Sequence, residues 1–111
     1  MESRKDSTRR YEVERSACHA ERPGFRINEL QISPIQEIPW HYHTIIQDTF
    51  YVLQGRLCVS LRDPEEEVRL SPGETYTVRA RRPHLVTNAG EGSAIFLVLQ
   101  GLGEYDFIPA P

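Results

Sequence analysis

No stretch of this sequence stays apolar for long enough to cross a membrane. The longest apolar run covers residues 94–99, whereas a transmembrane helix needs about 20 such residues. The first twenty residues also lack the apolar segment that defines a secretory signal. The sequence therefore predicts a protein that neither spans a membrane nor is secreted, and we expect it in the cytoplasm.

Cysteine is scarce, and the charge is not dominated by one sign. The two cysteines, Cys18 and Cys58, are expected to be reduced thiols rather than a disulfide, as is usual in cytoplasmic proteins. Thirteen Lys and Arg residues oppose 16 Asp and Glu residues, which leaves a net charge of −3 and a pI of 5.8. A nucleic-acid-binding domain is typically basic, with a pI above about 9, so we expect no nucleic acid partner.

Segments long enough for a stable helix are absent after residue 22. Eight prolines and seven glycines divide the chain into short pieces, and a proline inside a helix costs about 3 kcal/mol. The pieces are rich in β-branched and aromatic residues, and turn-forming residues separate them. Strands are predicted over residues 11–17, 25–33, 36–43, 48–54, 56–62, 66–70, 75–79, 84–88 and 94–100. Many short strands predict an all-β sandwich or barrel in which no helix exceeds about two turns.

The chain has the size and composition of one domain. Its 111 residues, of which 39% are hydrophobic, can form a single core. We expect residues 1–9, which are polar and charged, to be a disordered tail, and residues 10–111 to form one barrel domain. Residues 10–17 alternate like a strand but are too polar for a core. We therefore expect them to cover a sheet edge across the two-fold axis of a homodimer.

Two histidines separated by one residue are the first chemical signal. His41 and His43 occupy positions i and i+2 of a predicted strand, so both side chains point to one face. Two imidazoles on one face can bind the same ion at about 2.1 Å per bond. Asp48 offers a carboxylate five residues later, and His84 begins another predicted strand. The pair alone is a weak signal, because a strand histidine is more often a hydrogen-bonded residue than a metal ligand.

The residues around this pair resemble the first motif of the cupin superfamily, G-x5-H-x-H-x3–4-E-x6-G. His41, His43 and Gly55 are in register with the motif. Asp48 stands where the family usually has glutamate, and Ile35 stands where it has the leading glycine.

The second cupin motif, G-x5-P-x-G-x2-H-x3-N, follows at short separation. Gly73, His84 and Asn88 match it in register, whereas Arg79 and Arg81 replace the proline and the glycine. Both motifs in order, within about residues 25–100, make the resemblance specific.

The resemblance implies a double-stranded β-helix, a jelly-roll barrel of two antiparallel sheets with one divalent transition metal inside. Carried over residue by residue, the metal ligands are His41, His43, Asp48 and His84. Imidazole and carboxylate ligands suit Fe, Mn, Ni, Co, Cu and Zn, so the sequence does not choose among these metals.

Asp48 is one methylene shorter than the glutamate of the family motif. Either its strand lies closer to the ion and the carboxylate binds directly, or a water molecule bridges the gap. The spacing from Asp48 to Gly55 equals that of the family, which implies an unshifted strand and favours the bridged arrangement. A strand flipped by one residue would present Gln47 instead.

The resemblance also implies a small-molecule ligand or substrate. We expect a metal-dependent enzyme, with dioxygenase, isomerase and lyase chemistry not distinguished. The alternatives are a sugar- or effector-binding module without turnover and a structural barrel with a solid interior. The predicted pocket residues are Phe50, Tyr76, Arg79, Arg81 and Phe96. Arg79 and Arg81 can bind a carboxylate or phosphate, although a solvated turn is the simpler explanation and the one we favour.

Overall fold

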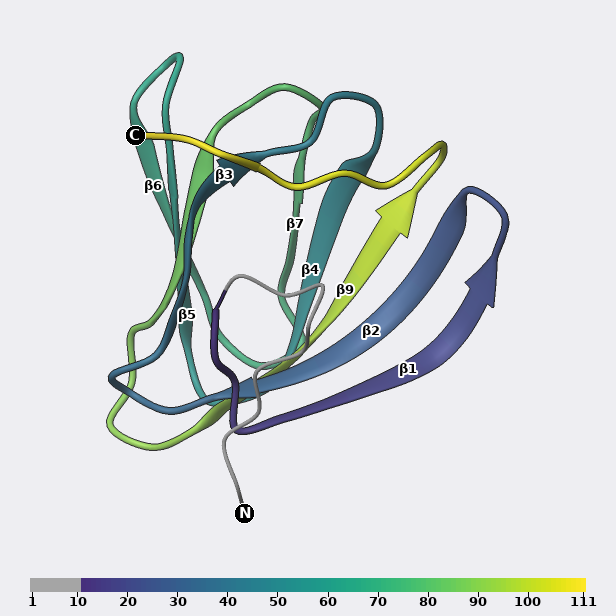
Figure 1. The fold of residues 1–111 in the computed structure, drawn as a ribbon. Helices are drawn as coiled ribbons and strands as arrows, with labels where there is room; N and C mark the ends of the chain where they lie inside the picture. Colours follow the sequence, from purple (N-terminus) through teal and green to yellow (C-terminus); the bar gives the residue numbers. More distant parts are fainter. Residues whose placement is uncertain (1–10) are drawn as a thin grey trace.

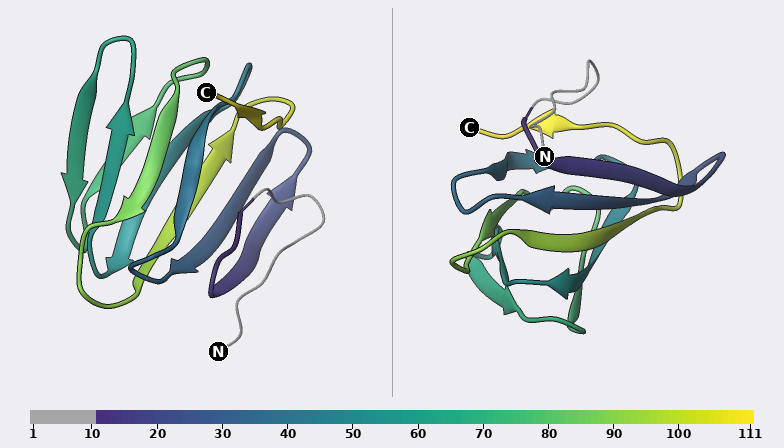
Figure 2. Two further views of the ribbon diagram at one scale, coloured as in Figure 1. Left: turned by 60° about the vertical axis from the view of Figure 1, so that its left-hand side comes forward. Right: turned by 90° about the horizontal axis from the view of Figure 1, so that it is seen from below.

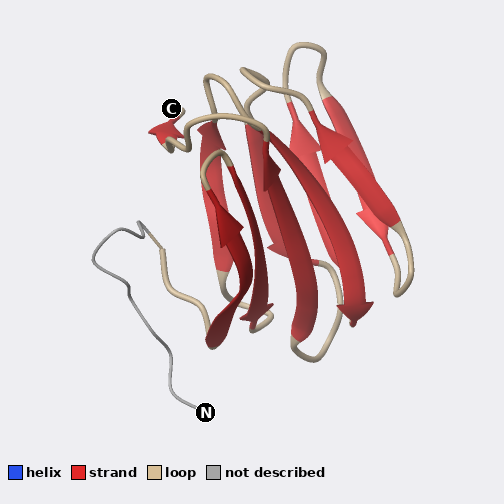
Figure 3. Cartoon of the chain, turned by 90° about the vertical axis from the view of Figure 1, so that its right-hand side faces the viewer, coloured by secondary structure: helices blue, strands red, loops and turns tan. Residues whose placement is uncertain are grey.

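The structure is a computed structural model that describes residues 11–111. The strands are β1 (Arg15–Arg22), β2 (Phe25–Ile32), β3 (Glu37–Tyr42), β4 (Gln47–Gln54), β5 (Leu57–Leu61), β6 (Glu66–Leu70), β7 (Thr75–Val78), β8 (His84–Asn88), β9 (Ala94–Gly101) and β10 (Ile108–Pro109). The described residues form strands and loops without a helix (Figure 3), so none of their segments is a membrane-spanning helix. The predicted disordered tail, residues 1–9, lies outside this range.

The strands form two antiparallel five-stranded sheets that face each other (Figures 1 and 2). One sheet has the order β1-β2-β9-β4-β7, and the other has the order β10-β3-β8-β5-β6. Strands that are neighbours in a sheet are mostly distant in sequence, because the chain passes repeatedly from one sheet to the other. This is the jelly-roll arrangement, and it confirms the predicted double-stranded β-helix.

Side chains that alternate along the strands fill the space between the sheets. In β9, Phe96 and Val98 are buried, and the residues on either side of each are partly exposed. In β4 the same alternation buries Asp48, Phe50 and Val52. Because a strand points every second side chain to one face, the phase that buries Phe50 and Val52 also turns Asp48 into the interior.

Gly55 follows β4 and has a backbone that other residues rarely adopt. Its φ is +80°, and a Cβ atom at this position would lie 2.7 Å from the carbonyl oxygen of Ser93 and 2.9 Å from Cα of Ala94. Both the left-handed φ and the close approach require glycine. The last glycine of the first motif therefore stands at a position with a physical need for it.

The first strand differs from the sequence prediction. Residues 11–17 were expected to be extended, but β1 covers Arg15–Arg22 and pairs with β2 through the tight turn at Pro23 and Gly24. Gly24 has a φ of +81°, which suits such a turn. The turn, rather than the side-chain alternation, positions this strand. Backbone pairing starts directly beside the turn, where Arg22 lies opposite Phe25.

Candidate metal centre

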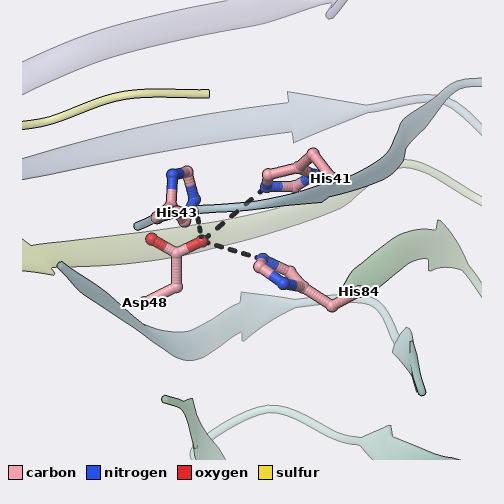
Figure 4. Close-up of side chains that lie close together, drawn as sticks. All are labelled: His41, His43, Asp48 and His84. Carbon is pink, nitrogen blue, oxygen red and sulfur yellow. Dashed lines mark hydrogen bonds and ion pairs between the residues drawn. The ribbon is translucent and has the colours of Figure 1, made fainter. Parts of the chain in front are cut away.

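The side chains of His41, His43, Asp48 and His84 meet inside the barrel (Figure 4). Each is at most 3% exposed, and their candidate ligand atoms all lie within 4.8 Å of one another. Asp48 Oδ2 lies 2.9 Å from His43 Nε2, 3.0 Å from His84 Nε2 and 4.0 Å from His41 Nε2. The fold thus brings together the four residues that the two motifs predicted as ligands.

Strand pairing explains the convergence. His41 of β3 lies opposite His84 of β8 in the antiparallel register, so their side chains leave the same sheet side by side. His43 follows immediately after β3. Asp48 comes from β4 in the facing sheet, so its carboxylate points at the three rings across the interior.

Backbone carbonyl groups orient all three imidazole rings. The carbonyl oxygens of Pro39, Asp106 and Arg82 lie within hydrogen-bond distance of Nδ1 of His41, His43 and His84, respectively. A carbonyl oxygen only accepts, so each Nδ1 carries a proton. In the neutral ring Nε2 then has a free lone pair, the form in which histidine binds a metal.

The acceptors around two of the rings fit a bound cation. His43 and His84 each have a carbonyl oxygen at Nδ1 and Asp48 Oδ2 at Nε2. A neutral imidazole has one proton for these two acceptors, so in each neutral ring a lone pair faces the carboxylate oxygen. A metal ion held by these Nε2 atoms and Oδ2 would relieve this repulsion. The donor set of three imidazole nitrogens and one carboxylate oxygen therefore fits a divalent transition metal.

Burial and mutual contacts shift the pKa values of three of the four groups. Burial lowers the pKa of His41 to about 3, and the neighbouring His84 adds to this shift, so His41 is neutral at pH 7. Burial alone would lower the pKa of His43, but the hydrogen bond and charge of Asp48 outweigh it and raise that pKa. Burial opposes ionisation of Asp48, yet the neighbouring imidazoles of His43 and His84 hold its pKa below the usual range. The buried carboxylate is therefore charged.

Two residues that the sequence analysis missed hold the carboxylate in place. Gln100 Nε2 donates to Asp48 Oδ1 over 2.9 Å, and Gln100 Oε1 accepts from Arg26 Nε over 2.6 Å. Because arginine has no acceptor, this pair determines the orientation of the amide. Oδ1 is thereby occupied, and Oδ2 is left for the histidines. Gln100 shares the inward phase of Phe96 and Val98 in the structure, but no sequence alternation reveals this phase, because residues 94–99 are all apolar.

The segment after β9, seen in Figure 1 as the yellow chain that runs from β9 across β3, contacts one side of the site. Its Asp106 bonds His43 through the backbone carbonyl and bonds the backbone N–H and the hydroxyl of Thr44 through the carboxylate. The ring of Phe107 stacks on His41, with centroids 4.3 Å apart and planes 11° apart. Both motifs lie within residues 25–100, and the segment after them has no regular alternation. Its contribution to the site was therefore not predicted from the sequence.

A cavity of about 400 Å³ adjoins the cluster, within the range of small-molecule sites. Besides His41, His43 and Asp48, it is lined by residues of β1, β2 and β9 and of the segment after β9, among them Arg26, Gln100, Tyr105 and Phe107. Of the five predicted pocket residues, Phe50 lines this cavity.

The other four predicted pocket residues lie elsewhere. Tyr76 contacts Arg82 and Glu66 through its hydroxyl, and Phe96 is fully buried in the core. The guanidinium groups of Arg79 and Arg81 donate to the backbone carbonyls of Asp63 and Thr44. The two arginines thus bond local loops, which agrees with the simpler explanation given for them above.

Comparisons with a family model and with solved structures agree on the fold. A family model described as "Cupin domain" matches residues 28–105. No curated protein matches the sequence. Among solved structures, a conserved Klebsiella pneumoniae protein with a double-stranded β-helix domain is 21% identical, with a TM-score of 0.77 over 97% of this chain and 90% of its own.

Two further solved structures of similar fold belong to proteins with specific names. KdgF from Halomonas sp. is 21% identical, with a TM-score of 0.71 over 80% of this chain and 78% of its own. An oxalate oxidase is 19% identical, with a TM-score of 0.71 over 79% of this chain and 47% of its own, so this chain spans about half of its length. At these identities the likenesses show a common fold.

Proposed function

This chain belongs to the cupin domain family, and from that premise we propose that it binds one divalent transition metal and acts on a small molecule. The proposed ligands are His41, His43, Asp48 and His84, and the metal is one of Fe, Mn, Ni, Co, Cu and Zn. The observation that carries the proposal is the approach of three histidine Nε2 atoms to one buried carboxylate oxygen. Titration of Mn²⁺ or Zn²⁺ into chelator-treated protein, followed by calorimetry, tests it.

The roles of the chain's own residues follow from their contacts. Backbone carbonyls hold the three rings with Nε2 toward the interior, and Gln100 holds Asp48. Phe107 covers His41 and limits the access of water to that side of the site. When bound, the ion supplies Lewis acidity or redox chemistry, and the adjoining cavity gives a small molecule access to it.

We favour a metal-dependent enzyme over a sugar- or effector-binding module. The cavity beside the cluster argues against a purely structural barrel, and one protein of similar fold is an oxidase by name. Turnover separates the remaining two hypotheses. We expect the metal-loaded protein to consume O2 or convert substrate in a screen of small organic acids and sugars. A ligand that binds unchanged, with no turnover of any compound, would favour the binding module.

The position of Asp48 now supports direct coordination rather than the water-bridged arrangement favoured by the sequence. Separations of 2.9 and 3.0 Å from Oδ2 to two Nε2 atoms are those of neighbouring ligands on one ion with bonds of about 2.1 Å. We expect Asp48→Asn to weaken metal binding by more than about 100-fold, beyond the 10- to 100-fold typical of outer-shell changes. Calorimetric metal titration measures the loss.

The matched control for that variant is Asp63→Asn, which removes the same charge from an exposed turn and should leave metal affinity unchanged. A loss of at most about 100-fold in Asp48→Asn would indicate a bridging water molecule instead.

Metal affinity should decrease as the pH is lowered, because metal and protons compete for the imidazole nitrogens. The pKa of His43 is raised above the ordinary histidine value of 6.5, so His43 gains its proton at a higher pH than an ordinary histidine. Affinity should be full above this raised pKa and fall about tenfold per pH unit below it. Metal titrations between about pH 5.5 and 8 test this, and a constant affinity across that range would exclude His43 as a ligand.

The metal-free protein should respond to pH with two opposite contributions. The depressed pKa of His41 stabilises the fold above pH 6.5, and this contribution is lost as the pH falls toward about 3. The raised pKa of His43 stabilises the fold at low pH, and this contribution is lost as the pH rises through it.

The homodimer and the cytoplasmic location stay predictions. Among the described residues, β1 is an edge strand of its sheet, and an edge strand offers unpaired backbone groups to a second copy. Light scattering should give a mass of twice 12.8 kDa. A mass of one chain at working concentration would contradict the dimer.

A further inference from the structure

Arg26 is a charged residue of β2 that lines the same cavity as the proposed metal ligands. Its Nε donates to Gln100, and its guanidinium carbon lies 3.7 Å from the centroid of the Tyr105 ring. The hydrogen bond and the ring contact together restrict the guanidinium. Arg26 is thus a half-buried cation, held in place beside the site.

The terminal amino groups of Arg26 have no protein partner within residues 11–111. Its one hydrogen bond uses Nε, and no ion pair joins it to Glu21, although Glu21 lies opposite it in the β1–β2 register. Arg82, by contrast, directs its terminal groups at Tyr76 and Glu66 and at a backbone carbonyl. The two terminal amino groups of Arg26 are therefore available to a molecule in the cavity.

We propose that Arg26 binds the carboxylate group of a small organic acid whose other end carries an oxygen donor for the metal; this inference rests on the proposed function. The planar guanidinium matches a carboxylate with two parallel hydrogen bonds. Phe50, Tyr105 and Phe107 line the cavity and offer apolar contact to the carbon skeleton between the two ends.

The charges that face the cavity favour an anion. With a divalent ion bound, the ion and Arg26 outweigh the negative charges of Asp48 and Glu21. Arg26 is the single arginine among the described residues of the lining, which include no lysine. One guanidinium suits a singly charged carboxylate group better than a phosphate dianion, which is usually bound by several donors.

The contacts also couple the two ends of the site. Arg26 reaches Asp48 through Gln100 by two hydrogen bonds, of 2.6 and 2.9 Å. An anion on Arg26 and a metal on Asp48 are therefore bound by one connected network. The positive charge of the ion should raise the affinity for the anion, and by reciprocity the anion should raise the affinity for the ion by the same factor.

The test is calorimetric titration of the metal-loaded full chain with malonate, succinate and glutarate, whose lengths probe the distance from Arg26 to the ion. Neutral succinamide and inorganic phosphate are the comparison probes. We expect one of the dicarboxylates to bind, and succinamide and phosphate to bind at least tenfold more weakly. Arg26→Met should weaken dicarboxylate binding by roughly 10- to 100-fold, and Arg26→Lys, which keeps the charge without the fork, should lie in between.

Two further variants calibrate the effect of charge. Arg69→Met removes an exposed arginine that pairs with Glu67 on β6, and it should bind the dicarboxylate like the wild type. Glu21→Gln removes a negative charge from the cavity lining and should strengthen binding. The metal content of each variant is measured alongside, so that a loss of metal is not mistaken for a loss of the anion site. If Arg26→Met loses metal, dicarboxylate binding to metal-loaded Arg26→Lys is compared with the wild type instead.

Three results would overturn the proposal. They are equal binding of the dicarboxylate to the wild type and to a metal-loaded Arg26 variant, phosphate binding tighter than every dicarboxylate, and no binding of any dicarboxylate to the wild type. A wild type that takes up no metal contradicts the proposed function instead. In that case the Arg26 variants are compared for dicarboxylate binding to the metal-free chain, where equal binding again overturns the anion site.

Discussion

Replacing His84 with alanine is expected to abolish metal binding. The ring is 1% exposed, and its Nε2 lies 3.0 Å from Asp48 Oδ2, so the truncation removes a ligand from the centre of the cluster and leaves at most a water molecule in its place. A four-ligand zinc site contributes about 10–16 kcal/mol, so one ligand contributes on the order of 3 kcal/mol, or more than a hundredfold in affinity. The bound metal of dialysed protein should drop from one ion per chain to near zero.

Melting temperature gives a second measurement of the same change. Metal that binds only the folded state raises the melting temperature of the wild type by mass action, and His84→Ala should lose this increase. The matched control is His19→Ala, because His19 is half-exposed and pairs with Glu29 on the surface. A His84→Ala protein that keeps one ion per chain would exclude this histidine as a ligand.

Replacing Phe96 with alanine is expected to destabilise the fold by about 3–5 kcal/mol, because the truncation leaves a cavity in the core. Phe96 is completely buried, and its ring centroid lies 6.2 Å from that of Phe50. This loss is a large part of the 5–15 kcal/mol that stabilises a typical domain. Chemical denaturation of Phe96→Ala measures it.

The control for the core variant is Ile35→Ala, because Ile35 is 94% exposed and its truncation should change stability by less than about 0.5 kcal/mol. Phe96 was predicted from the sequence to line the substrate pocket. Unchanged stability of Phe96→Ala, together with altered ligand binding, would support that placement over the core position described here.

The parts of the fold that were predictable from sequence depend on local signals. β-Branched and aromatic residues along 48–54 and 94–100 predicted the strands β4 and β9, and glycine and proline indicated the turns between strands. The start of β1 was not predictable, because it depends on the turn at residues 23–24 and on pairing with β2 rather than on its own pattern. The strand β10 has two residues, too few for any pattern.

The same distinction applies to the site. The four proposed ligands were identified from two sequence motifs, each confined to a short stretch of chain. The residues that hold Asp48 were not, since Arg26 and Gln100 are 74 positions apart and meet only through the register of β2 and β9. Arginines beside His84 were expected near the ligand, but hydrogen bonds to loop carbonyls hold Arg79 and Arg81 elsewhere.

The central claim, that three histidines and one aspartate bind a single metal ion, is tested most directly by X-ray absorption at the metal edge together with elemental analysis. The wild-type protein is loaded with metal and dialysed before both measurements. We predict one divalent transition metal ion per chain, with a first shell of three imidazole nitrogens and one carboxylate oxygen at about 2.0–2.2 Å. A protein that retains no stoichiometric metal, or whose metal lacks imidazole ligands, would contradict the account.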